Sequence, residues 1–170
     1  MKIIGKIAML AVAGAIAFAA CKKKDNSTTT PTPAKTQKDY LMDGKWQITS
    51  IKVSSLLGNQ DLCDTMPACR KDNLATFLSS GKVLTDEGPT KCSSTAAQTD
   101  SSGTWSLTDD FKQITVNASW VLSGHNTFQV LELTTTSLKL AQSFDTTITI
   151  SPLPPYTTTI KDTVIAKTVN

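Results

Sequence analysis

The sequence contains few of the residues that enzymes use for catalysis. Among its 170 residues the only histidine is His125 and the only arginine is Arg70. A histidine-based triad or general base would have to use His125, whose Ser-Gly-His-Asn context is typical of an exposed turn. Glycine-rich phosphate loops and a CxxC metal-ligand pair are also missing. We therefore expect a protein that is not an enzyme and holds no cofactor and no metal.

An excess of charge of one sign is missing as well. The chain has 17 lysine and arginine residues against 14 aspartate and glutamate residues. Two of the basic residues, Lys2 and Lys6, lie in an N-terminal leader, and without them the chain is almost neutral. Nucleic-acid binding requires basic residues clustered on one face. The composition therefore gives no support for a nucleic-acid partner.

Long apolar runs are limited to the N-terminus. Lys2 and Lys6 precede an uncharged apolar run over 7–18, which is shorter than the ~20 residues of a transmembrane helix. This order of charge, apolar run and small residues is that of an export signal. Phe18-Ala19-Ala20-Cys21 resembles the lipobox of bacterial lipoproteins, with phenylalanine in place of the usual leucine. The resemblance implies that the signal peptide, 1–20, is removed and that Cys21 carries lipid.

Residues 21–39 are predicted to form a disordered, lipidated tether. The stretch 26–38 is rich in threonine and proline and has no large apolar side chain, so it cannot bury enough surface to offset its ordering entropy. Lys22, Lys23 and Lys24 suit contact with anionic head groups. We expect the membrane to be a partner through Cys21. Because no aspartate follows Cys21, we expect the outer membrane, in its periplasmic or its surface-exposed leaflet.

From Tyr40 onward, polar and apolar side chains alternate with a period of two, which is typical of β-strands. The stretch 138–150 keeps one mainly apolar face over 13 residues, and 114–122 repeats the pattern. In the first strand the apolar phase of Trp46 changes before Ile51, which predicts a β-bulge near Thr49–Ser50. About eight strands result, and no helix is indicated after the leader.

Half-buried strands of this number must pair with a second sheet or close on themselves. Eight strands close into a barrel that is wide enough for packed side chains or for one small ligand. For residues 40–170 we therefore predict an all-β fold, an antiparallel up-and-down barrel.

Three cysteines remain once Cys21 is assigned to the lipid, namely Cys63, Cys69 and Cys92. Pairing is expected in an oxidising compartment. The segment between Cys69 and Cys92 has the pattern of a hairpin, which would bring its flanks together, so we expect this disulfide and a free Cys63. The alternative is a three-cysteine metal site, which lacks a nearby histidine.

Five acidic residues crowd the region of the first long loop and raise the question of a calcium site. Their spacing matches no known calcium-binding loop. We therefore expect solvated loop acids: Asp61, Asp64, Asp72, Asp86 and Glu87.

Several short motifs follow the order found in a known family. Gly44-Lys45-Trp46 opens the first strand as the glycine–any–tryptophan motif opens the lipocalins. Over roughly 40–145 the chain resembles the lipocalin-like domain of bacterial lipoproteins, which implies a calyx-shaped barrel with paired cysteines at Cys69 and Cys92. The chain departs from classical lipocalins because it lacks a late Thr-Asp-Tyr motif, an arginine that covers Trp46 and a C-terminal helix, so no specific ligand class transfers.

These patterns lead to two hypotheses of function. The first is a lipid-anchored, non-enzymatic module that binds a small apolar or amphipathic molecule inside the barrel, with the Leu56–Asp72 loop at the mouth. The second is an envelope interaction protein with a filled barrel that contacts a protein or a glycan. For the first hypothesis the candidate ligand contacts are Trp120, Phe128, Val130, Leu140 and Phe144.

Overall fold

A computed structural model describes residues 34–56, 58–121, 124–149, 152 and 154–169. The expected signal peptide and the lipid-bearing Cys21 lie outside these residues. The described helices are α1 (Gln37–Asp43), α2 (Leu62–Thr65) and α3 (Ala68–Lys71). The described strands are β1 (Lys45–Ser55), β2 (Gly58–Asp61), β3 (Leu74–Phe77), β4 (Lys82–Asp86), β5 (Thr99–Leu107), β6 (Gln113–Asn117), β7 (Thr127–Leu133), β8 (Ser137–Ile148) and β9 (Tyr156–Val169). Within the described part, no helix combines the length and the apolar character needed to cross a membrane.

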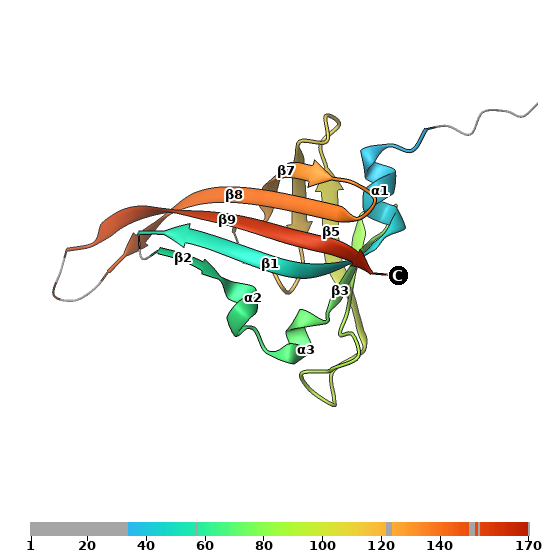
Figure 1. Cartoon of the computed structure of the whole chain (residues 1–170), viewed down its shortest axis with the longest axis horizontal. Coiled ribbons are helices and arrows are strands. Elements are labelled where there is room, and N and C mark those ends of the chain that lie inside the picture. The colour runs from blue at the N-terminus through green and yellow to red at the C-terminus, as the bar shows by residue number, and fades with distance from the viewer. Residues whose placement is uncertain (1–33, 57, 122–123, 150–151, 153, 170) are drawn as a thin grey trace, which may run out of the picture. The chain divides into compact units, whose positions relative to one another are not determined.

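Eight of the strands form a closed antiparallel barrel (Figure 1). Strands β1 and β3 to β9 pair in chain order, and β9 then pairs with β1 from Lys45↔Val169 to Ser54↔Lys161. The remaining strand, β2, pairs with the part of β1 that follows the last β1–β3 pair, Gln47↔Leu74. The predicted all-β, up-and-down barrel of about eight strands is confirmed.

The bulge predicted in the first strand is present. The register between β1 and β9 shifts between Ile48 and Ser50. Ile48 pairs with Ala166 and Ile51 pairs with Val164, so both isoleucines lie on the same face of the sheet despite their odd spacing. One extra residue in β1 therefore keeps the apolar side chains directed into the barrel while the strand bends.

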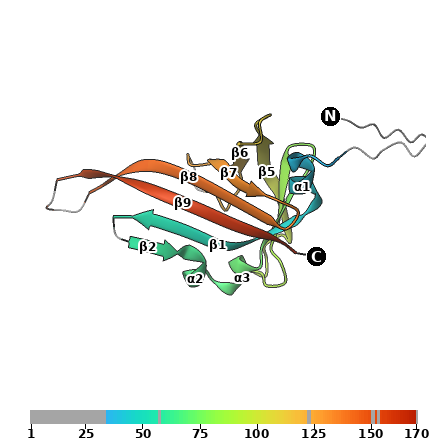
Figure 2. The same cartoon turned by 45° about the horizontal axis from the view of Figure 1, so that its top comes forward.

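The core fills the end of the barrel at which β1 begins, and α1 lies at this end (Figure 2). Leu41 of α1 is fully buried beside Trp46, and the Trp46 Nε1 donates a hydrogen bond of 2.8 Å to the Leu41 carbonyl oxygen. The buried apolar residues are Leu41, Trp46, Ala75, Phe77, Val83, Trp105, Ile114, Val116, Phe128, Leu133, Leu138, Leu140 and Ala166.

The three short helices were not indicated by the sequence. α1 begins at Gln37, so residues 37–39 belong to the folded domain and not to the expected tether. The Thr36 side chain accepts a hydrogen bond from the Asp39 amide and the Asp39 carboxylate accepts one from the Thr36 amide, which forms a capping box. Burial of Leu41 stabilises a helix of only seven residues, which would be marginal in isolation.

At the opposite end the strands have unequal lengths. β8 and β9 stay paired as far as Ile148↔Tyr156, whereas the pairing of β7 with β8 ends at Gln129↔Ala141. The pairing of β1 with β9 ends at Ser54↔Lys161. Beyond these points β8 and β9 continue as a two-stranded ribbon (Figure 1).

Candidate functional site

The candidate site is a pocket of about 550 Å³ at the place where β7 and β8 separate. On one side lies the start of β7 with the segment before it, 124–129, and on the other side lies the stretch 141–144 of β8. Residues 161–163 of β9 and Gln113, the first residue of β6, complete the lining. The lining includes consecutive residues of a strand, whose side chains point to opposite faces of the sheet. This is expected where the wall of a barrel is interrupted.

An aromatic stack lies at the edge of this pocket. The rings of His125 and Phe144 are 3.8 Å apart between centroids, with an angle of 23° between their planes. Phe144 lies three residues beyond Ala141, the last residue of β8 that pairs with β7, and its ring packs against the histidine. The expectation of an exposed turn histidine is therefore wrong, because His125 is half-buried against this ring.

Polar groups replace apolar ones on the inner face of β8 and β9 toward the pocket. The pairs Leu138↔Ala166 and Leu140↔Val164 belong to or pack against the core, and the next pair in the same phase is Gln142↔Asp162. The Gln142 Nε2 donates a hydrogen bond of 3.1 Å to one carboxylate oxygen of Asp162. Asp162 is only 8% exposed, and its second oxygen is buried with no hydrogen-bond partner among the described residues.

The structure separates the five ligand contacts expected from the sequence. Phe128 and Phe144 line the pocket. Leu140 belongs to the buried core, and Val130 packs against it. These four residues of β7 and β8 therefore lie between the packed core and the pocket, two at the core and two at the pocket.

Trp120 lies apart from the other four candidates. The sequence predicted a strand that extends to residue 122, but β6 ends at Asn117 and Trp120 lies in the turn that follows. Its side chain is 37% exposed, and its Nε1 donates a hydrogen bond of 3.3 Å to the hydroxyl of Thr85 on β4. A turn residue can continue an alternating sequence pattern by chance, and that misled the prediction.

Sequence reasoning missed His125, Gln142 and Asp162 as residues of the pocket. A signal existed for Gln142, because it occupies an apolar phase of the longest alternating run. The Leu56–Asp72 loop, which was expected at the mouth, forms β2, α2 and α3, and none of its described residues lines the pocket.

The acidic residues near the first loop act mainly as hydrogen-bond acceptors for the backbone. Asp61 accepts bonds from the Ser50 hydroxyl and from the amides of Ile51 and Cys63, so it satisfies the backbone beside the β1 bulge and caps α2. The hydroxyl of Ser50 and then the Ile51 amide hold the pKa of Asp61 below its ordinary value. No group of three or more potential metal ligands occurs among the described residues.

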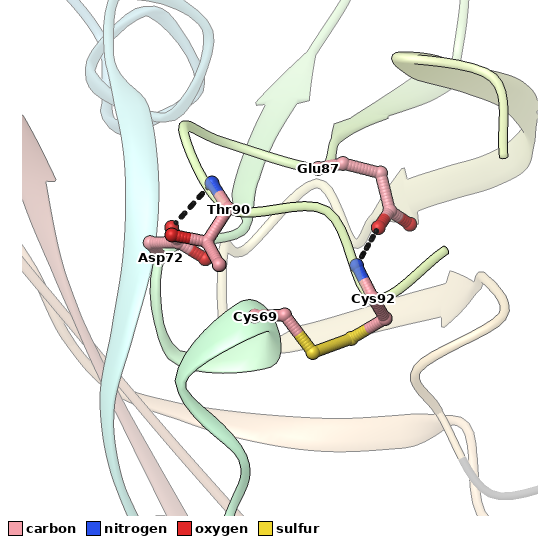
Figure 3. The surroundings of a disulfide bond; sticks show 5 residues. All are labelled: Cys69, Asp72, Glu87, Thr90 and Cys92. Carbon is pink, nitrogen blue, oxygen red and sulfur yellow. Dashed lines mark hydrogen bonds between the residues drawn. A yellow bond between two sulfur atoms is a disulfide. The ribbon is translucent and has the colours of Figure 1, made fainter. Parts of the chain in front are cut away.

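The predicted disulfide between Cys69 and Cys92 is confirmed, and it connects α3 with the segment after β4 (Figure 3). Around it, the Asp72 carboxylate accepts a hydrogen bond of 2.9 Å from the Thr90 amide, and Glu87 accepts one of 3.5 Å from the Cys92 amide. Gly88 permits this approach, because a Cβ there would lie 2.3 Å from the Asp72 carbonyl oxygen.

Cys63 is the free thiol of the described region. Burial, followed by the nearby Asp61 carboxylate, raises the pKa of the Cys63 thiol. The thiol is therefore kept protonated near neutral pH, which disfavours a nucleophilic role.

A family model described as a lipocalin-like domain matches residues 42–140, which is more than half of the chain. The chain belongs to the lipocalin-like domain family. No curated protein and no solved structure matches it. The match runs from the end of α1 to Leu140 of β8, so Gln142, Phe144 and Asp162 of the lipocalin-like barrel lie beyond it.

Proposed function

We propose that this lipocalin-like protein binds one small amphipathic molecule in the pocket between β7 and β8. The observation that carries the proposal is the pocket itself, whose volume of about 550 Å³ falls within the range typical of small-molecule sites. Phe128 and Phe144 supply apolar surface, and Gln142 and Asp162 supply polar groups. Barrels of this size in the lipocalins hold one small ligand.

The position of the core favours a ligand at the open end of the barrel. Trp46, Val83, Ile114 and Val116 are at most 1% exposed and fill the end that α1 covers. A ligand deep in that end would have to displace side chains from a close-packed interior. This modifies the first hypothesis from the sequence, which placed the ligand inside the barrel without distinguishing its ends.

A direct test uses 4-phenylbutanol, a neutral, water-soluble amphiphile, and isothermal titration calorimetry. The full chain is held in detergent micelles, and heats from protein-free micelles are subtracted. We expect saturable binding with one site, and we expect Phe144→Ala to weaken it by about tenfold, because loss of one aromatic contact removes on the order of 1.4 kcal/mol.

The matched control is Leu131→Ala, which removes an apolar side chain that is 54% exposed on β7 and does not line the pocket. It should bind 4-phenylbutanol as the unmodified protein does. Equal losses in the two variants, or no saturable binding at all, would contradict the proposal.

The second part of the proposal concerns location. A lipid on Cys21 would hold the domain at the outer membrane, since one cysteine with several acyl chains gives stable membrane association. The support is the lipobox-like Phe18-Ala19-Ala20-Cys21 sequence behind an export signal. We expect the mass of the protein isolated from cells to show loss of residues 1–20 and a diacylglycerol-containing Cys21, and we expect Cys21→Ser to leave the membrane fraction. A Cys21→Ser variant that stays membrane-bound with an unchanged modification would refute the anchor, whereas Cys63→Ser is the matched cysteine control.

A further inference from the structure

The carboxylate of Asp162 has an unusual environment for a charged group. Asp162 lines the pocket and is about nine-tenths buried, and Gln142 donates a hydrogen bond to only one of its carboxylate oxygens. The other oxygen is shielded from solvent and has no partner among the described residues. A buried charge is strongly unfavourable unless it is paired. Asp162 is thus a buried acceptor that lacks a donor among the described residues.

The charged residues nearby do not supply that donor. Neither of the two ion pairs found in the described region includes Asp162. Lys161 also lines the pocket, but it belongs to the opposite phase of β9, where it pairs with Ser143 and Ser54 and is exposed to solvent. His125 is stacked on Phe144. Asp162 is the one acidic residue among the described residues of the lining.

We propose that the ligand of this pocket is a small organic cation, an amine with an apolar body, whose ammonium group pairs with the free oxygen of Asp162. The inference rests on the proposed function and specifies its ligand class. An ammonium group offers N–H donors together with the opposite charge, so it satisfies the oxygen that lacks a partner and neutralises the carboxylate. Gln142 fixes the orientation of the carboxylate through the other oxygen, and the apolar body lies against Phe128 and Phe144.

The test compares three probes that differ only in their head group: 4-phenylbutylamine, 4-phenylbutanol and 5-phenylpentanoate. They are titrated into the full chain at neutral pH by the calorimetric assay described above. We expect the amine to bind about 30-fold more tightly than the alcohol, and the carboxylate to bind most weakly, because a buried charge pair is the main difference between the complexes.

Asp162→Asn keeps the size of the side chain and removes its charge. It should reduce the affinity for the amine by about 30-fold and thereby abolish the preference for the amine over the alcohol. Asp145→Asn is the matched control, because Asp145 is an exposed carboxylate on β8 that accepts a hydrogen bond from Thr159 and does not line the pocket. It should retain the preference for the amine.

The outcomes separate the two proposals. Equal binding of the amine and the alcohol to the unmodified protein would overturn the cationic ligand and leave the pocket intact as a binding site. An undiminished amine preference in Asp162→Asn would also overturn it. Binding of none of the three probes would overturn both proposals. If Asp162→Asn fails to fold, as judged by circular dichroism, the ranking of the probes on the unmodified protein decides the question.

Discussion

Replacing Trp46 with alanine is expected to lower the free energy of unfolding by about 4 kcal/mol. The indole is 1% exposed and lies in the core cluster at the closed end of the barrel. The substitution leaves a large cavity there and removes the hydrogen bond from its Nε1 to the Leu41 carbonyl oxygen. Because that bond joins β1 to α1, we expect the helix to separate from the barrel in the same variant. Urea unfolding followed by far-ultraviolet circular dichroism measures the change.

Trp120→Ala is the matched control for this prediction. Trp120 is 37% exposed and makes one side-chain hydrogen bond, to Thr85, so its removal should change the stability by no more than about 1 kcal/mol. Similar losses for the two tryptophans would show that the closed end of the barrel does not dominate the stability.

Removing the disulfide by the double substitution Cys69→Ser and Cys92→Ser is expected to destabilise the domain by about 3 kcal/mol. The bond closes a loop with a sequence separation of 23 residues, which contains the β3–β4 hairpin. Its loss gives the unfolded chain more conformational freedom. In the folded state, the hydrogen bonds of Asp72 and Glu87 with the backbone amides of residues 90 and 92 would remain.

Urea unfolding with and without a reductant measures this effect. Reduction should bring the unmodified protein to the stability of the double variant and should leave the double variant unchanged. Cys63→Ser removes the free thiol and serves as the control, with an expected change within about 0.5 kcal/mol for a position away from the core. A double variant as stable as the unmodified protein would contradict the prediction.

The strands of the barrel could be predicted because the alternation of polar and apolar side chains along a strand indicates which of its faces is buried. The alternation over 138–150 indicates one buried face, whichever strands lie beside it. The phase change between Trp46 and Ile51 likewise indicates a bulge without knowledge of the partner strand. The disulfide followed from a hairpin between its two cysteines. These are local patterns, which a single sequence contains.

The features that sequence reasoning missed depend on contacts between distant segments. α1 has only seven residues, and burial of Leu41 beside Trp46 decides that it forms. The pocket lies where β7 and β8 cease to pair after Gln129↔Ala141, and although Gln142 interrupts the apolar phase of its strand, that signal does not predict the end of the pairing. Nothing in the sequence distinguishes Asp162, because its buried second oxygen, which has no partner among the described residues, is evident only in the folded barrel.

The placement of α1 also determines which end of the barrel can exchange a ligand with its surroundings. The polypeptide enters the barrel through this helix, at the end that Trp46 fills, whereas the pocket opens where β7 begins. A ligand of the pocket can therefore enter and leave at the end of the barrel opposite α1, without any opening of the packed base.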